Sequence, residues 1–252
     1  MDVRLTRAGN RAVGLALMVL VSAVLGTVVV TTARSPAKPA VPSPAAAAPA
    51  VGAPHVTAAP TKTPLPMKYV VLTFDDGPDA EYTPKVLDVL AKFDAKATFF
   101  EVGKNVVKHP ELTKRIHEAG HSVQNHTWDH ADLRKLGAAA FQKEVTSTDQ
   151  AIRAQTGSTP TCLRPPYGGV SATVRQRAKA MGKDLVVWTV DSRDWTKPGT
   201  AAVVQRVLKN VHSGSVILMH DGGGNRTQTV AALPAILKAL KAQGYGFRTL
   251  TC

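Results

Sequence analysis

Seven short apolar runs, separated by segments compatible with helices, constrain the fold of this 252-residue chain more than any other feature. The runs cover residues 69–74, 97–102, 121–124, 161–164, 185–190, 215–219 and 246–250. Strand-like runs that alternate with helical segments predict a parallel α/β architecture. The first intervening helix is expected to begin with Thr83 as its N-cap and Pro84 at its first position. Periodicity alone does not distinguish a closed barrel from an open sheet.

Polar side chains follow five of these runs, and barrel enzymes gather functional groups at the carboxyl ends of their strands. The first run ends in Asp75 and Asp76, two adjacent carboxylates that indicate a metal or a catalytic base, with an Asp-Gly turn as the plain alternative. The other positions are His126, Arg164, Asp191 and His220. Residues with only structural roles would scatter over both ends, so the sequence predicts one functional rim.

His126 and His130 form the strongest metal-binding signal. They lie four residues apart and would share one face of a helical turn. Two imidazole nitrogens and one carboxylate bind a divalent ion while leaving coordination positions open, so Asp76 is the expected third ligand. The isolated histidines are interpreted as ordinary core or surface residues: His109, His117 and His212.

Five motifs, taken in order, resemble those of the NodB-homology polysaccharide deacetylases, also called carbohydrate esterase family four. They are Thr73–Gly77, His126–His130, Arg164–Gly168, Asp191–Trp195 and Leu218–His220. The resemblance covers about residues 67–252 and implies a distorted (β/α)7 barrel that forms a single catalytic domain.

The resemblance also implies roles for the reacting groups. Asp76, His126 and His130 would hold a divalent metal, with zinc expected and cobalt or manganese as alternatives. Asp75 would be the base that takes a proton from the attacking water, held ionised by Arg164. A structural ion pair is the alternative role for Arg164.

The remaining implied roles concern the leaving group and the acetyl pocket. His220 would be the acid that protonates the leaving amine, oriented by Asp194. The backbone N–H of Tyr167 would stabilise the oxyanion. Trp195 and Leu218 would wall the acetyl pocket, or else belong simply to the core. Asp191 is expected at most to brace its loop.

The predicted reaction is metal-dependent hydrolysis of N-acetyl groups from an acetylated amino-sugar polysaccharide, peptidoglycan or chitin-like. An O-acetyl esterase acting on xylan is the alternative within the same chemistry. A silent glycan-binding module would be expected to lack Asp75 or His220, and a non-haem iron oxygenase would not need them. The glycine-rich stretch 221–225 has no Lys-Ser/Thr sequel, so it predicts a flexible rim loop and not a phosphate site.

The amino-terminal third indicates export. Residues 12–30 are uncharged and mostly apolar and follow three arginines, which predicts a signal peptide or membrane anchor over residues 1–34 with both alternatives open. Residues 35–66 hold nine of the 17 prolines and predict a disordered linker to a domain at 67–252. The catalytic domain is therefore expected outside the cell, secreted or held at the cell envelope.

Charge and cysteine content fit that location. The formal net charge of +13 comes without an interleaved basic and aromatic stripe, so nucleic acid is not expected; the charge indicates an anionic cell-wall environment or has no specific role. The two cysteines, Cys162 and Cys252, should pair in an oxidising compartment, with two free thiols as the alternative. A monomer is expected.

Overall fold

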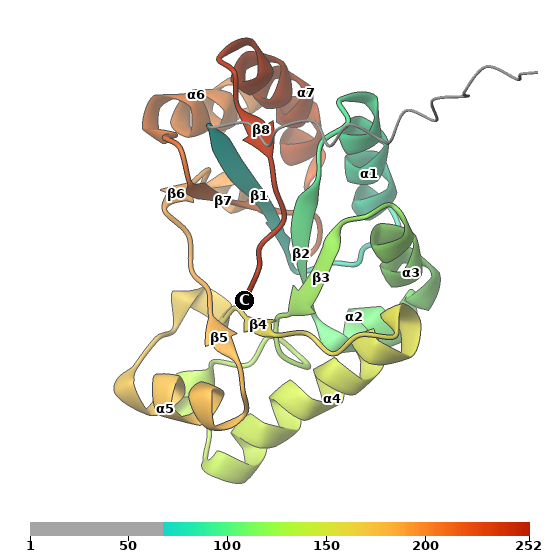
Figure 1. Cartoon of the computed structure of the whole chain (residues 1–252), viewed down its shortest axis with the longest axis vertical. Coiled ribbons are helices and arrows are strands. Elements are labelled where there is room, and N and C mark those ends of the chain that lie inside the picture. The colour runs from blue at the N-terminus through green and yellow to red at the C-terminus, as the bar shows by residue number, and fades with distance from the viewer. Residues whose placement is uncertain (1–67) are drawn as a thin grey trace, which may run out of the picture. The chain divides into compact units, whose positions relative to one another are not determined.

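The computed structural model describes residues 68–252, whose strands form one parallel sheet curled into a distorted (β/α)7 barrel, as predicted (Figure 1). The sheet order is β5-β4-β3-β2-β1-β7-β6, with β8 beside the start of β1. The strands are β1 Tyr69–Asp75, β2 Ala97–Glu101, β3 Ser122–Asn125, β4 Cys162–Leu163, β5 Asp184–Leu185, β6 Val190–Asp191, β7 Ser215–His220 and β8 Gly246–Phe247.

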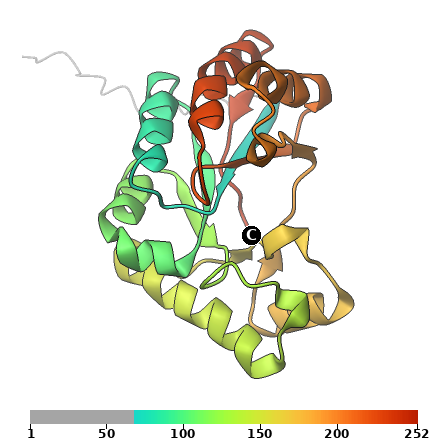
Figure 2. The ribbon, with the colours of Figure 1, turned by 180° about the vertical axis from the view of Figure 1, so that it is seen from behind.

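Seven α-helices connect the strands of the described region and lie outside the curled sheet (Figure 2). They are α1 Tyr82–Lys92, α2 Gly103–Lys108, α3 Pro110–Glu118, α4 Ala138–Thr156, α5 Ala172–Ala180, α6 Thr200–Asn210 and α7 Thr227–Ala242. Three short 3-10 turns follow the sheet's carboxyl ends: η1 Leu133–Lys135, η2 Pro166–Gly168 and η3 Asp194–Thr196. Within residues 68–252, no helix has the length and apolar character needed to cross a bilayer. The predicted export segment and linker lie outside the described residues.

The alternation of side chains along β1 separates the core from the barrel interior. Leu72 and Phe74 belong to the main hydrophobic cluster, and the Phe74 ring stacks on Phe99 with centroids 5.2 Å apart. Because successive side chains of a strand point to opposite faces, Thr73 and Asp75 turn the other way, into the barrel. Both are buried and both meet Arg164. The same strand thus anchors the helix layer and delivers a carboxylate to the interior.

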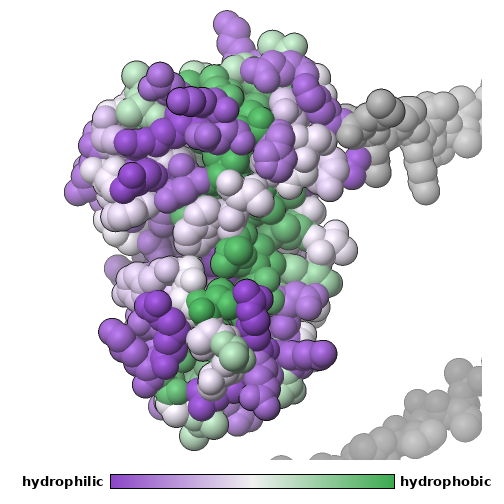
Figure 3. Space-filling view, turned by 90° about the vertical axis from the view of Figure 1, so that its left-hand side faces the viewer, coloured by the Kyte–Doolittle hydropathy of each residue, from purple (hydrophilic) through white to green (hydrophobic). Residues whose placement is uncertain are grey.

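The predicted single strand over 185–190 is wrong, because the chain forms two short strands there. Residue Val186 donates its N–H to Leu163 on the β4 side, whereas Thr189 donates to Val216 on the β7 side. No ladder joins β5 to β6, so the barrel has an open seam between them. On the side of the molecule that carries β5 and β6, hydrophobic residues run lengthwise down the middle of the face, with hydrophilic residues on both sides (Figure 3).

The predicted N-cap of the first helix is also wrong. Helix α1 begins at Tyr82, and the Asp79 carboxylate accepts hydrogen bonds from the N–H groups of Glu81 and Tyr82 at 2.8 and 2.9 Å. Thr83 donates its hydroxyl instead to the buried Asp221 carboxylate at 2.5 Å. A buried carboxylate needs such a donor. The Thr83 oxygen also accepts the Asp79 N–H at 2.8 Å, so Thr83 supports the capping residue from within the first turn.

The carboxyl-terminal segment crosses the amino ends of the strands. The N–H of Leu250 donates to Thr98 near the start of β2 at 2.9 Å. Cys252 forms a disulfide with Cys162 in β4, with Cα atoms 5.5 Å apart. The bridge closes a 90-residue separation at the end of the barrel opposite the polar rim.

Candidate active site

One cavity of about 350 Å³ opens at the carboxyl ends of the strands. Most of the predicted site residues line it, while Arg164 and Asp194 lie buried just behind its wall. The lining residues are Asp75, Asp76, His126, His130, Pro165, Tyr167, Trp188, Asp191, Trp195, Leu218, His220 and Arg226. The structure therefore gathers the predicted polar residues at one rim, where parallel barrels carry their sites.

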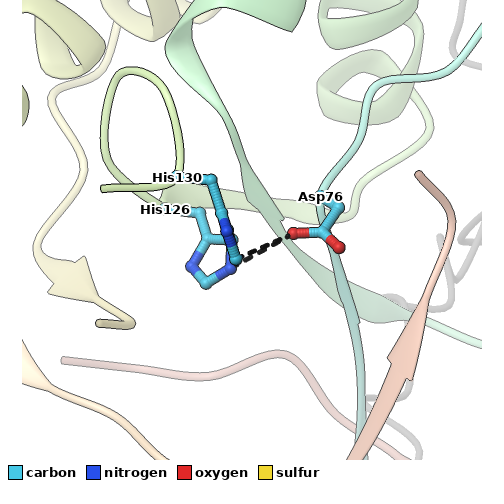
Figure 4. Close-up of side chains that lie close together, drawn as sticks. All are labelled: Asp76, His126 and His130. Carbon is cyan, nitrogen blue, oxygen red and sulfur yellow. Dashed lines mark ion pairs between the residues drawn. The ribbon is translucent and has the colours of Figure 1, made fainter. Parts of the chain in front are cut away.

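Asp76, His126 and His130 face one another (Figure 4), and all three line this cavity. The Asp76 Oδ1 atom lies 3.5 Å from His126 Nε2 and 3.3 Å from His130 Nε2. The helical turn expected for the two histidines is not formed. They meet through a loop in which Thr127 and His130 both have positive φ, and their ring centroids lie 5.0 Å apart. The four-residue spacing does bring the two histidines to a shared site, but a loop joins them in place of the predicted helical turn.

The donor set fits a divalent cation. The Nδ1 atom of His126 lies 2.7 Å from the carbonyl oxygen of Arg164, and a carbonyl can only accept, so Nδ1 carries the proton. This arrangement directs Nε2 toward Asp76, as second-sphere partners of metal-binding histidines do, and Nε2 could bind a cation once it has given up its proton. Two such nitrogens and a carboxylate oxygen, all within 4.8 Å, form a candidate metal centre in the described region.

The charges at this centre are strongly coupled. Burial alone would raise the pKa of Asp76. The hydrogen bond and charge of His126, and to a smaller extent the charges of His220 and His130, lower that pKa well below its usual range. Burial and the neighbouring His126 lower the pKa of His130. The Asp76 carboxylate is therefore ionised and the His130 imidazole favours its neutral form, the states in which both bind cations. Burial lowers the pKa of His126, but the charges of Asp75 and Asp76 raise it overall, so His126 would release a proton on binding a cation.

Asp75 occupies one side of the centre and is held by Arg164. The guanidinium Nη1 of Arg164 lies 2.6 Å from Asp75 Oδ1 and 2.7 Å from the Thr73 hydroxyl. Arg164 is fully buried, with the Phe100 ring 4.0 Å from its Cζ. Its Nε and Nη2 atoms also reach the carbonyls of Val186 and Val187, both at 3.4 Å. A single side chain thus fixes a carboxylate and bridges the open seam.

His220 occupies the opposite side and is held by Asp194. His220 Nδ1 lies 2.7 Å from Asp194 Oδ1, and Thr229 donates its hydroxyl to Oδ2 at 2.7 Å. Burial lowers the pKa of His220, but the hydrogen bond and charge of Asp194 outweigh it and raise that pKa above its ordinary value. Burial conversely raises the pKa of Asp194, and His220 lowers it overall. His220 therefore favours its protonated form with Nε2 free to act.

The rim carries the predicted aromatic residues. Tyr167 and Trp195 are exposed at 68% and 50%, which argues against a core role for Trp195. Leu218 is buried within β7 and still lines the cavity. The Asp191 carboxylate accepts the N–H of Arg193 at 2.8 Å, which fits a bracing role.

Sequence reasoning missed Trp188 and Arg226, which also line the cavity. Trp188 lies in the run 185–190, which predicts one continuous strand. Nothing in that pattern indicates that Trp188 lines the cavity at the seam. Arg226 directly follows the glycine-rich stretch that was interpreted as a flexible loop. The only available signal was an arginine next to a loop at a functional rim.

The fold carries three groups at one rim: a histidine-carboxylate donor set, a carboxylate on one side of it and an imidazole on the other. This arrangement is typical of a barrel hydrolase. Comparison with known proteins agrees. The family model for polysaccharide deacetylases matches residues 62–186. The chain is 40% identical over 186 residues to a peptidoglycan-N-acetylglucosamine deacetylase of Bacillus cereus, with 73% of this chain and 87% of that protein covered.

Two further relatives extend the comparison. A chitooligosaccharide deacetylase of Sinorhizobium fredii is 41% identical over 192 residues, with 72% of this chain and 89% of that protein covered. The structure of a family 4 carbohydrate esterase from Streptomyces lividans in complex with acetate matches with a TM-score of 0.69 and 37% identity, over 74% of this chain and 94% of that one. The chain belongs to the polysaccharide deacetylase family and is a hydrolase of that class.

Proposed function

We propose that this protein removes N-acetyl groups from an amino-sugar polysaccharide of the cell wall. The observation that carries the proposal is the placement of the Asp76–His126–His130 donor set between Asp75, held by Arg164, and His220, held by Asp194. Hydrolysis of an amide needs a base for the water and an acid for the amine. These two groups flank the same cavity.

The roles follow from the partners of each group. Asp75, paired with Arg164, accepts the proton of the attacking water. His220, kept protonated by Asp194, gives its Nε2 proton to the departing nitrogen. A divalent ion held by Asp76, His126 and His130 would polarise the acetyl carbonyl and lower the pKa of a water, and we propose zinc. The Tyr167 backbone N–H supports the developing oxyanion.

The acetyl group is proposed to enter between Trp195 and Leu218. Leu218 is buried and Trp195 is exposed, and both line the cavity, so together they offer an apolar wall for a methyl group. The wide, exposed rim suits a polymer better than an enclosed small molecule. The relatives named for peptidoglycan and chitooligosaccharide favour an N-acetylglucosamine unit.

We place the activity outside the cell, because the sequence predicts an export segment and a proline-rich linker before the catalytic domain. Peptidoglycan is then the proposed substrate, and chitin-like chains and acetylxylan are the competitors. We expect a monomer. The metal could also be cobalt or manganese, since their oxygen and nitrogen preferences overlap with those of zinc.

Acetate release from acetylated peptidoglycan, chitooligosaccharides and acetylxylan, measured side by side with the zinc-loaded protein, tests this proposal. We expect the amino-sugar substrates to be preferred. The Asp75→Asn and His220→Ala variants should each retain zinc and lose at least about 10²-fold in rate. Because the two groups serve one reaction, the double variant should lose less than the product of the single losses. Full activity in either zinc-loaded single variant would overturn the assigned roles.

A further inference from the structure

Asp76 sits in a backbone conformation that needs support. Its φ of 73° lies in the left-handed region, which costs a non-glycine residue free energy unless the surroundings hold it. One support is Asn105, whose side-chain amide donates to the Asp76 carbonyl at 2.8 Å. The carboxylate itself must be held by something else, because the two histidines contact only Oδ1.

The other carboxylate oxygen, Oδ2, faces the glycine-rich loop at 222–224. Gly223 has a φ of 69° and packs so closely that a Cβ at this position would overlap Asp76 Oδ2. Only glycine combines that conformation with that approach. The loop therefore covers the side of the carboxylate that faces away from the histidines.

Arg226 fixes this loop from the cavity wall. Its Nε donates to the Gly222 carbonyl at 2.5 Å and its Nη2 donates to the Gly223 carbonyl at 3.0 Å. The same Nη2 lies 3.7 Å from Asp76 Oδ2, an ion-pair distance beyond hydrogen bonding. Only 5% of Arg226 is exposed, so solvent screens this charge weakly. Its chief contacts are with the loop, and its charge adds attraction for one oxygen.

We propose that Arg226 is a positioning residue for the divalent cation that Asp76, His126 and His130 would hold. By pinning the 222–224 loop against Oδ2, it orients Asp76 so that Oδ1 alone is presented to the cation. This inference rests on the proposed metal centre and extends it to a residue outside the five motifs. Outer-sphere partners of metal ligands typically change metal affinity by about 10- to 100-fold when removed.

Zinc affinity of the full-length chain, measured by competition with a chromophoric chelator, tests the inference. We expect Arg226→Gln and Gly223→Ala each to weaken the zinc Kd by at least about 10-fold. The matched control is Arg175→Gln, which removes the same charge from the exposed face of α5 and should leave the Kd unchanged. Thermal melting of the metal-free proteins shows whether each variant is folded. One folded variant, Arg226→Gln or Gly223→Ala, is enough to test the inference.

Activity separates positioning from substrate contact. We expect the Arg226→Gln variant to lose activity at limiting zinc and to regain most of it at saturating zinc. A wild-type Kd in a folded Arg226→Gln or Gly223→Ala variant would overturn the inference. So would a kcat/KM loss that persists at saturating zinc with an unchanged Kd, because it would place Arg226 on the substrate. Failure of the wild-type chain to bind zinc would instead overturn the metal centre itself, and the inference with it.

Discussion

Replacing Asp194 by asparagine should disable His220 without removing it. The Asp194 carboxylate accepts four hydrogen bonds: from the His220 N–H at 2.8 Å, His220 Nδ1 at 2.7 Å, the Thr229 hydroxyl at 2.7 Å and the Trp195 N–H at 2.9 Å. An amide has one acceptor oxygen, so its NH₂ group must face two of these donors. Each unsatisfied buried group costs about 1–3 kcal/mol of folding free energy.

Either orientation of the amide harms the acid. If the NH₂ group faces Nδ1, that atom must become an acceptor, and the doubly protonated imidazole is lost. If the oxygen faces Nδ1, the hydrogen bond survives but the negative charge that stabilises the imidazolium is gone. We therefore expect deacetylation to fall by at least about 10²-fold, the scale of positioned proton transfer.

The pH dependence should move in one direction. Asp194 raises the pKa of His220 against the effect of burial, so the protonated acid is present at low pH and is lost as the pH rises through that pKa. This loss is the expected alkaline limb of the activity profile. Without the Asp194 charge the pKa falls, and the alkaline limb should shift to lower pH.

Acetate release across pH, with zinc content verified, measures both effects. Thr229→Val is the matched control, since it removes one hydrogen bond to Asp194 and keeps the charge. It should destabilise the protein slightly and lower the rate by less than about 10-fold, in line with the loss of a single hydrogen bond. An Asp194→Asn protein with the wild-type alkaline limb and rate would refute the reasoning that His220 is an acid supported by Asp194.

Three further predictions concern stability. Arg164→Met should lower the free energy of unfolding by about 3–5 kcal/mol in denaturant titrations, because it leaves the Asp75 charge buried and unpaired; a loss below 1 kcal/mol would contradict this, as single core substitutions commonly cost about that much. Reducing the Cys162–Cys252 disulfide should lower the free energy of unfolding by about 2–5 kcal/mol and leave activity intact while the protein stays folded. An unchanged unfolding midpoint after reduction would contradict this prediction. Burial raises the pKa of Glu101 from 4.5 to about 8, so wild-type stability should fall as pH rises between these values, and Glu101→Gln should flatten that fall.

The chemistry of the site was predictable because it depends on residue type and order. Strand ends are recognisable as the last residues of apolar runs, and parallel strands bring those ends together. This logic predicts that Asp75, His126, Arg164 and His220 lie at one rim. Predicting these positions does not require the hydrogen bonds and ion pairs that orient each side chain.

The backbone route between the histidines could not be predicted in this way. A spacing of four residues favours a helical turn, but Thr127 and His130 adopt positive φ and form a loop. The loop is held by contacts distant in sequence, such as the Trp128 N–H donating to Glu144 on α4 at 2.8 Å. Local propensity carries no information about such partners, and tertiary contacts decide the outcome.

The split of the run 185–190 shows the same limit at the level of the fold. Its residues favour a continuous strand, yet two short strands form, because the chain must leave the β4 edge and reach the β7 edge. The partly buried carbonyls of Val186 and Val187 then lie outside any strand pairing, and backbone carbonyls that leave water need donors. Arg164 supplies them with the guanidinium that also holds Asp75. The contacts across the seam and the ion pair that holds Asp75 thus come from one side chain, so activity loss in an Arg164 variant has meaning only beside a measurement of its folding.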